Sequence, residues 1–253
     1  MVAALYPLAF AAEEVGGLGP EVIDLTPPGS EAHDVEVSFE DRTALESAGL
    51  VLYLGDIGFQ PQIERAVEDA AGEVVVAAEG IDGEDPHVWL DPVAFAETAD
   101  RVAEGYANVD PDNADGYHSR AAELRGRLEA IDERYRTTLD DCRLGTLLVT
   151  HEAFGYLAQR YGLEQAGLAG LSPEGEPTAA ALAEAEALVR DGRVEAVFYE
   201  ETEEGRRIAE AVGDDLGISA LPLATLESRP AEGDYLTVME ANLVSLAEGL
   251  GCG

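Results

Sequence analysis

Three of the four histidines follow extended or turn-rich segments, which is where α/β proteins place their ligand-binding loops. His33 comes after the turn-rich stretch 27–30, His87 lies within the segment 85–92, and His151 directly follows the apolar run 147–150. Zinc favours imidazole nitrogen, and three histidines with an open fourth position form a known zinc arrangement. Their types and positions indicate a candidate divalent-metal site, although a histidine in a loop is more often a surface or capping residue.

The remaining reactive side chains have simpler interpretations. His118 lies beside Tyr117 on a predicted helix, away from its apolar stripe, and we expect it to face solvent. Cys142 and Cys252 have no second ligand at metal-binding spacing, and two isolated cysteines are as often buried thiols as a bridge.

A zinc-dependent hydrolase is the main alternative from another functional class, because three histidines and a metal-bound water also describe a catalytic site. Glu152, next to His151, would then be the general base. The segment lacks the second histidine that a zinc-protease helix carries four residues further on, and no Ser or Cys nucleophile with a partner histidine is apparent. These patterns favour a binding protein over an enzyme.

Short apolar, β-branched runs alternate with amphipathic helical patterns, which predicts βαβ units on parallel sheets. One set of predicted strands lies at 22–25, 50–54 and 74–76, and a second set lies at 146–149, 194–199 and 218–221. The fold class is therefore α/β, with two lobes that each hold a parallel sheet flanked by helices.

A long helix from Pro111 to Leu139 is predicted between the lobes, with Asp110 as its N-cap. Apolar residues recur there at alternating steps of four and three, at positions 117, 121, 124, 128, 131, 135 and 139. A second amphipathic helix ends the chain, with Asp234 as its expected cap and Gly251 beyond its end. We expect an N-terminal lobe at 1–110, one rigid backbone helix at 111–139 and a C-terminal lobe at 140–253.

The charge balance excludes some partners. The chain has 52 acidic and 15 basic residues, all of the latter Arg, for a net charge of -37. This charge opposes binding to nucleic acids and to anionic membranes. Acidic and apolar residues are interleaved, so we interpret the chain as a folded protein from a halophile rather than a disordered one. There is no apolar run of 18 residues, so we expect no membrane insertion within this sequence.

Five ordered blocks along the chain resemble the signature segments of zinc and manganese ABC-transporter solute-binding proteins of cluster A-I. They are Tyr6–Phe10 (YPLAF), Pro28–Glu36 (PGSEAHDVE), Asp85–Pro92 (DPHVWLDP), Thr150–Leu157 (THEAFGYL) and Leu171–Thr178 (LSPEGEPT). The resemblance implies that His33 and His87 come from the N-terminal lobe and His151 from the C-terminal lobe, with the ion in the interlobe cleft. It also implies an exported monomer whose leader lies outside these residues and which delivers the ion to a membrane permease. Some relatives were first described as surface adhesins, so a role as a metal-dependent surface adhesin stays an alternative.

The sequence departs from the family pattern at the fourth ligand. Relatives usually supply an Asp after the last strand of the C-terminal lobe, and the position aligned with it here is Ala224. The fourth ligand is then water or one of three carboxylates, Glu200, Glu201 or Glu227. Manganese-selective relatives use more carboxylate, so three histidines favour Zn2+ over Mn2+.

The extracytoplasmic location implied by the resemblance also bears on the cysteines. Cys142 precedes the strand that leads to His151, and Cys252 follows the last amphipathic helix. Because an oxidising compartment lets disulfides persist, we expect these two residues to be bridged.

Overall fold

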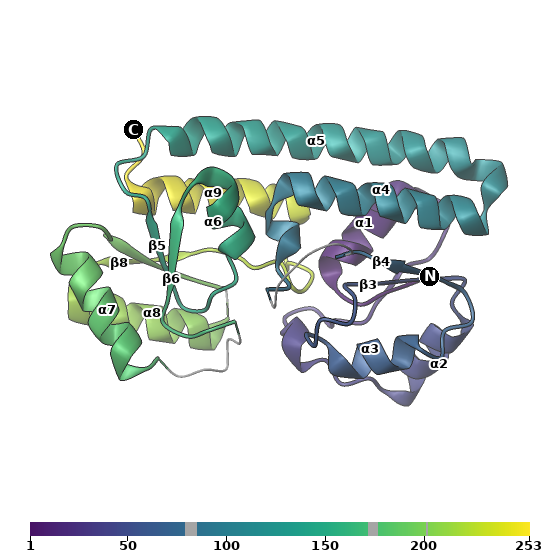
Figure 1. Cartoon of the computed structure of the whole chain (residues 1–253), viewed down its shortest axis with the longest axis horizontal. Helices are drawn as coiled ribbons and strands as arrows, with labels where there is room; N and C mark the ends of the chain where they lie inside the picture. Colours follow the sequence, from purple (N-terminus) through teal and green to yellow (C-terminus); the bar gives the residue numbers. More distant parts are fainter. Residues whose placement is uncertain (79–84, 172–176, 201) are drawn as a thin grey trace. The chain divides into compact units, whose positions relative to one another are not determined.

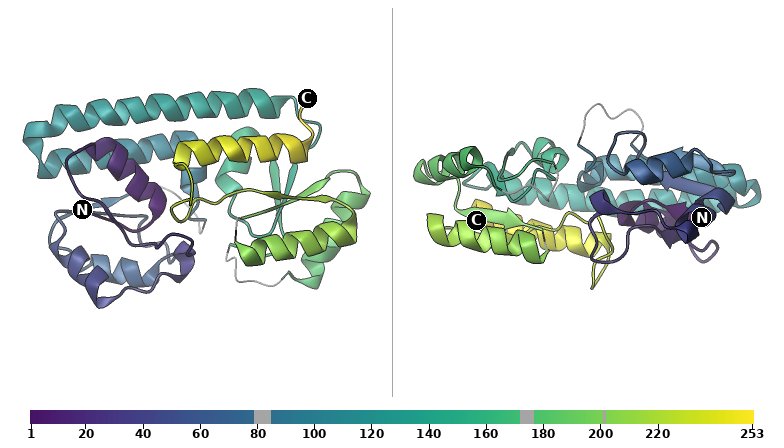
Figure 2. Two further views of the ribbon diagram at one scale, coloured as in Figure 1. Left: turned by 180° about the vertical axis from the view of Figure 1, so that it is seen from behind. Right: turned by 90° about the horizontal axis from the view of Figure 1, so that it is seen from below.

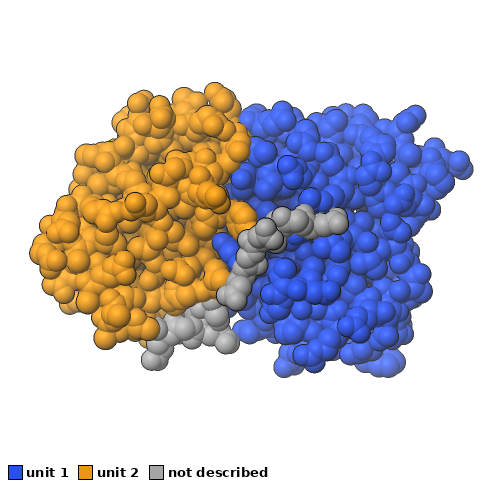
Figure 3. All heavy atoms as spheres, in the orientation of Figure 1, with its two compact units in different colours: residues 1–130, 226–236 blue, residues 131–225, 237–253 orange. Residues whose placement is uncertain are grey.

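Two four-stranded parallel sheets organise the chain in the computed structural model, which describes residues 1–78, 85–171, 177–200 and 202–253 (Figure 1). The first compact unit comprises Met1–Ala130 and Leu226–Leu236, and the second comprises Ile131–Thr225 and Thr237–Gly253 (Figure 3). The predicted α/β class with two parallel sheets is confirmed. The lobe limits predicted at 110 and 139 stay a prediction.

The sheet of the first unit has the strand order β2-β1-β3-β4. Its strands are β1 (Val2–Ala3), β2 (Ile23–Asp24), β3 (Leu50–Tyr53) and β4 (Glu73–Val76). Helices α1 (Tyr6–Gly16) and α4 (Pro92–Val109) cover one face, and α2 (Phe39–Ser47) and α3 (Pro61–Val67) cover the other (Figure 1). All four residues of β3 are buried, because a central parallel strand packs against helices on both faces.

The sheet of the second unit has the order β6-β5-β7-β8. Its strands are β5 (Thr146–Val149), β6 (Glu164–Gly167), β7 (Ala196–Tyr199) and β8 (Ser219–Pro222). Helices α7 (Ala179–Arg190) and α8 (Glu203–Leu216) pack on one face, while α6 (Gly155–Tyr161) and α9 (Tyr235–Leu250) lie on the other (Figure 1). Strand β6 was not predicted from the sequence, because its residues, EQAG, lack the β-branched side chains typical of strands.

The predicted long helix is confirmed, and its first turn is 3-10 rather than α-helical. Residues Pro111–Asn113 form the 3-10 turn η3, and α5 runs over Ala114–Asp140. The Asp110 carboxylate does not cap a helix, because it accepts hydrogen bonds from the Asn113 amide at 2.8 Å and the Tyr117 hydroxyl at 2.7 Å. The predicted apolar stripe is buried as expected, at Tyr117, Ala121, Leu124, Leu128, Ile131, Tyr135 and Leu139.

The C-terminal helix is secured within the second unit. Helix α9 follows Asp234 as predicted, and Figure 2 shows it running along the C-terminal part of α5. The Tyr135 hydroxyl donates to the Met239 carbonyl at 2.6 Å, and the predicted disulfide joins Cys142 to Cys252. Within the described residues, no helix is both long and apolar enough to cross a membrane.

Two sequence features fall partly or wholly outside the described residues. They are the acidic stretch 79–84 and the centre of the predicted turn 171–178.

Candidate metal centre

His33 is placed by a short turn at the end of the first sheet. It lies in η1 (Ala32–Asp34), which follows β2 and the turn containing Gly29. Its side chain is 16% exposed, and its ring meets the edge of Phe59 with 4.4 Å between ring centroids. The imidazole is therefore held against an apolar wall with limited freedom to rotate.

His87 is fully buried at the start of η2 (Val88–Leu90), 5.2 Å from the Trp89 ring between centroids. Asp85 fixes it twice, since one carboxylate oxygen accepts both the His87 backbone N–H at 3.0 Å and Nδ1–H at 2.8 Å. The segment then continues into α4, whose first turn is capped by the Asp91 side chain. Because Nδ1 is occupied, Nε2 is the nitrogen available to a ligand.

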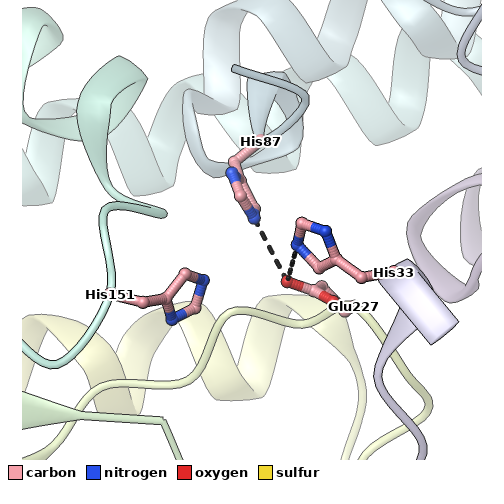
Figure 4. A group of neighbouring side chains, drawn as sticks. All are labelled: His33, His87, His151 and Glu227. Atoms are coloured by element: carbon pink, nitrogen blue, oxygen red, sulfur yellow. Dashed lines mark hydrogen bonds and ion pairs between the residues drawn. The ribbon is translucent and has the colours of Figure 1, made fainter. Parts of the chain in front are cut away.

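Glu227 joins the two histidines from a distant part of the sequence. One carboxylate oxygen, Oε1, lies 3.1 Å from His87 Nε2 and 3.6 Å from His33 Nε2. The other, Oε2, accepts the Ala32 backbone N–H at 3.0 Å. Figure 4 shows both imidazoles pointing toward this carboxylate, so the first unit alone gathers two nitrogen donors and one oxygen donor.

The charge of this cluster favours a cation. Burial would lower the pKa of His87, but hydrogen bonds to Asp85 and Glu227 outweigh burial and raise that pKa to about 9. Both ring nitrogens of His87 face carboxylates, which stabilise the protonated, positively charged imidazole. A divalent ion with affinity for imidazole suits the same place.

His151 belongs to the second unit, where it lies two residues after the end of β5. Figure 4 shows its side chain. Its side chain is 2% exposed, and Nδ1 lies 2.9 Å from Oε1 of the buried Glu200, which follows β7. His151 therefore resembles His87 in its surroundings, because each imidazole has a carboxylate of its own unit beside Nδ1.

The three candidates for a fourth ligand have different surroundings. Glu227 lies with His33 and His87, Glu200 lies against His151, and Glu201 is outside the described residues. Ala224, the position aligned with the family Asp, has its backbone N–H and carbonyl paired with the Asn242 side-chain amide at 2.9 Å and 2.8 Å.

His118 is exposed as predicted, with 46% of its side chain accessible. Asp85 was missed as a functional residue, although an Asp two residues before a candidate histidine could have indicated it.

Imidazoles and a carboxylate in the segments that follow parallel strands define an α/β protein of the metal-binding class. The chain belongs to the family described as "Zinc-uptake complex component A periplasmic", which matches residues 1–249. Among the family's curated proteins, the high-affinity zinc uptake system protein ZnuA of Bacillus subtilis (strain 168) is 29% identical, over 99% of this chain and 87% of that protein. The zinc-binding lipoprotein AdcA of Streptococcus pneumoniae is 26% identical over 98% of this chain, which spans only 55% of AdcA.

Solved structures agree with this assignment. The laminin binding protein Lmb of Streptococcus agalactiae, described as bifunctional with adhesin and metal transporting activity, has a TM-score of 0.90 and 29% identity, with 98% of each chain covered. The Zn(II)-bound ZnuA-like domain of S. pneumoniae AdcA has a TM-score of 0.85 and 27% identity, over 98% of this chain and 97% of that one.

Proposed function

We propose that this protein captures zinc outside the cytoplasm and delivers it to an ABC permease. The observation that carries the proposal is the position of Glu227 Oε1, which faces Nε2 of both His33 and His87 in a buried cluster. Two imidazoles and a carboxylate in one place are a donor set for a transition metal rather than for Mg2+ or Ca2+. Membership of a zinc-uptake family supports the same ion.

His151 is the proposed third imidazole ligand. Its burial, its position after β5 and the carboxylate beside its Nδ1 are the features that metal-binding histidines share. Glu227 is the proposed fourth ligand, in preference to water, Glu200 or Glu201. Glu200 Oε1 lies 2.9 Å from His151 Nδ1, a position that suits an orienting role better than a ligand role. Three nitrogen donors and one oxygen donor favour zinc over manganese.

The transport role follows from the family and fits the chemistry of the chain. A cognate permease in the membrane is the proposed partner, and the protein is expected to act as a monomer. The Cys142–Cys252 disulfide supports an extracytoplasmic location, because such bonds persist in oxidising compartments.

The alternative functions gain no support of their own. The segment after His151 lacks the second histidine that a zinc-protease helix carries four residues further on, so Glu152 has no such helix in which to act as the base of a hydrolase. Its backbone N–H is bonded to the Gly170 carbonyl. Among the residues that the structure describes, no specific feature supports an additional adhesin role.

Elemental analysis of protein purified without added metal, followed by competition between zinc and manganese, tests the proposal. We expect one zinc per chain and a clear preference for zinc. Absence of tight binding, or a preference for manganese, would refute the zinc-capture function. Assays of the zinc-loaded protein with ester and peptide substrates should show no turnover.

A further inference from the structure

Glu227 is carried by residues 226–236, here called the return segment, which follow β8 in sequence but belong to the first compact unit. Leu226 opens the segment with φ of 60°, a left-handed conformation that a branched side chain rarely adopts. Such a backbone persists only where neighbouring contacts hold it in place. The contacts on each side of Leu226 therefore help to place the backbone of Glu227, whose carboxylate is also held by Ala32 and His87.

Before Leu226, the chain is fixed in the second unit. The Asn242 side chain on α9 pairs with both the N–H and the carbonyl of Ala224. This pairing ends two residues before Leu226, so it cannot by itself orient the side chain of Glu227.

After Leu226, Arg229 attaches the return segment to α1. Its guanidinium donates to both carboxylate oxygens of Glu13, at 2.6 Å and 3.3 Å, and its Cζ lies 4.9 Å from the centroid of the Tyr6 ring. A bidentate contact with a carboxylate, together with a cation–π contact, fixes the direction of a guanidinium more tightly than a single ion pair would. Arg229 is the nearest residue after Glu227 with charged and aromatic contacts to another element of this unit.

Contacts of two further residues, Ser228 and Tyr235, extend the attachment. The Ser228 hydroxyl accepts the Gly29 backbone N–H at 3.2 Å, and Tyr235 donates to the Trp89 carbonyl. Tyr235 also stacks on Phe10, with 5.4 Å between ring centroids. Tyr235 lies eight residues beyond Glu227, so it secures the far end of the return segment rather than its beginning.

We propose that Arg229 is a positioning residue for the metal ligand Glu227, acting through its contacts with Glu13 and Tyr6. The inference rests on the proposed metal-binding function and deepens it by naming a residue that sets metal affinity without touching the ion. Metal ligands must be held within about 0.5 Å of their productive position, whereas two residues of loosened chain can shift a side chain by several ångströms. Loss of the Arg229 contacts should therefore weaken zinc binding through Glu227 alone.

The chain provides a matched control on the same helix. Arg127 pairs with Glu14, the neighbour of Glu13 on α1, and neither residue belongs to the return segment. The two ion pairs are similarly exposed, at 39% and 41% for Arg229 and Glu13 and at 46% and 32% for Arg127 and Glu14. The Arg127→Gln variant thus removes a comparable ion pair and should leave zinc affinity unchanged.

The experiment measures zinc dissociation constants by competition with a chromophoric chelator for the full chain and its variants. Arg229→Gln and Glu13→Gln, which break the same pair from opposite sides, should each weaken zinc binding about threefold to tenfold. In a Glu227→Gln background, Arg229→Gln should have no further effect, because the residue that it positions no longer supplies a carboxylate. General damage to the fold would instead lower affinity in both backgrounds.

The outcomes separate this proposal from the metal-binding function. Unchanged affinity in both Arg229→Gln and Glu13→Gln would overturn the positioning role while leaving zinc capture intact. Equal losses with and without the Glu227 carboxylate, or an equal loss in Arg127→Gln, would also overturn it. A wild-type protein that fails to bind zinc would refute the proposed function and this inference with it.

Discussion

One carboxylate oxygen of Asp85 accepts both the backbone N–H and the Nδ1–H of His87, at 3.0 Å and 2.8 Å. The double contact fixes the orientation of the imidazole and keeps a proton on Nδ1, so that Nε2 faces Glu227. Carboxylates in this position orient metal-binding histidines and raise their basicity.

Asp85→Asn should therefore weaken zinc binding by about 10-fold to 100-fold while the fold persists. Asn can still accept the backbone N–H, but it does not supply the negative charge. The measurement is a chelator competition, with circular dichroism to verify folding. Asp56→Asn, which replaces an exposed carboxylate after β3, is the control. Equal affinities for the two variants would exclude an orienting role for Asp85.

Replacing His87 itself should be more damaging. His87→Ala removes a proposed nitrogen donor and should abolish most high-affinity zinc binding. His118→Ala should bind zinc normally, because His118 is exposed on α5 and contacts only Glu104 at 4.0 Å among the ion pairs of the described residues. Isothermal titration of the two variants side by side provides the comparison, and comparable binding would remove His87 from the site.

Zinc affinity should rise with pH beyond neutrality. The pKa of His87 is raised from 6.5 to about 9, so a proton competes with the metal for Nε2 throughout the range below 9. One displaced proton corresponds to about a tenfold gain in affinity per pH unit. Titrations at pH 7, 8 and 9 measure this slope. A flat profile above pH 7 would mean that His87 is already neutral there.

The same shift predicts a pH dependence of stability for the protein without metal. A histidine whose pKa is raised on folding contributes stability that is fully present below its unfolded pKa of 6.5. That contribution should be lost as the pH rises from 6.5 through 9. The free energies of unfolding of the wild type and of His87→Gln, measured with urea, should therefore converge as the pH rises through this window. A constant difference between the two free energies would contradict the expectation.

The disulfide should stabilise the second unit without affecting metal binding. Cys142 and Cys252 close a loop with a sequence separation of 110 and also form an isolated antiparallel bridge. Replacing both by Ser should lower the free energy of unfolding by about 2–4 kcal/mol. Chemical denaturation measures this loss, and zinc titration of the same variant should match the wild type. A large loss of zinc affinity would show that the bridge does more than secure α9.

Asp132 on α5 should stabilise the second unit through the Arg residues around it. Arg160 donates to both of its carboxylate oxygens at 2.9 Å, and Arg136 adds a contact at 3.0 Å. Burial would raise the pKa of Asp132, but these hydrogen bonds outweigh burial and lower the pKa to about 2. Asp132→Asn should lower the free energy of unfolding by about 1–3 kcal/mol at pH 7.

A lowered carboxyl pKa gives stability that is present above the unfolded value of 3.8 and is lost as the pH falls toward 2. The difference in unfolding free energy between wild type and Asp132→Asn should therefore shrink below about pH 4. A difference that stays constant down to pH 3 would show that the charge of Asp132 is not its source.

The sequence by itself determined the architecture and the candidate histidines. Apolar β-branched runs located β3 and β5, because a strand buried on both faces must be continuously apolar. The stripe from Tyr117 to Leu139 located α5, since only one face of that helix packs against the rest of the chain. Strand β6 could not be found in this way, because its residues, EQAG, form a strand by pairing with β5 rather than by their own preference.

Only the tertiary structure decided which carboxylates accompany the histidines. Glu227 lies 140 positions from His87 and 195 from Ala32, yet it hydrogen-bonds to both. No local pattern encodes that pairing, so the sequence could not distinguish Glu200, Glu201 and Glu227 as candidates for the fourth ligand. The raised pKa of His87 has the same origin, because it depends on burial and on two carboxylates brought together by folding. Residue type and periodicity are local properties of the chain, whereas the distances and electric fields that make a metal site arise only when remote segments pack together.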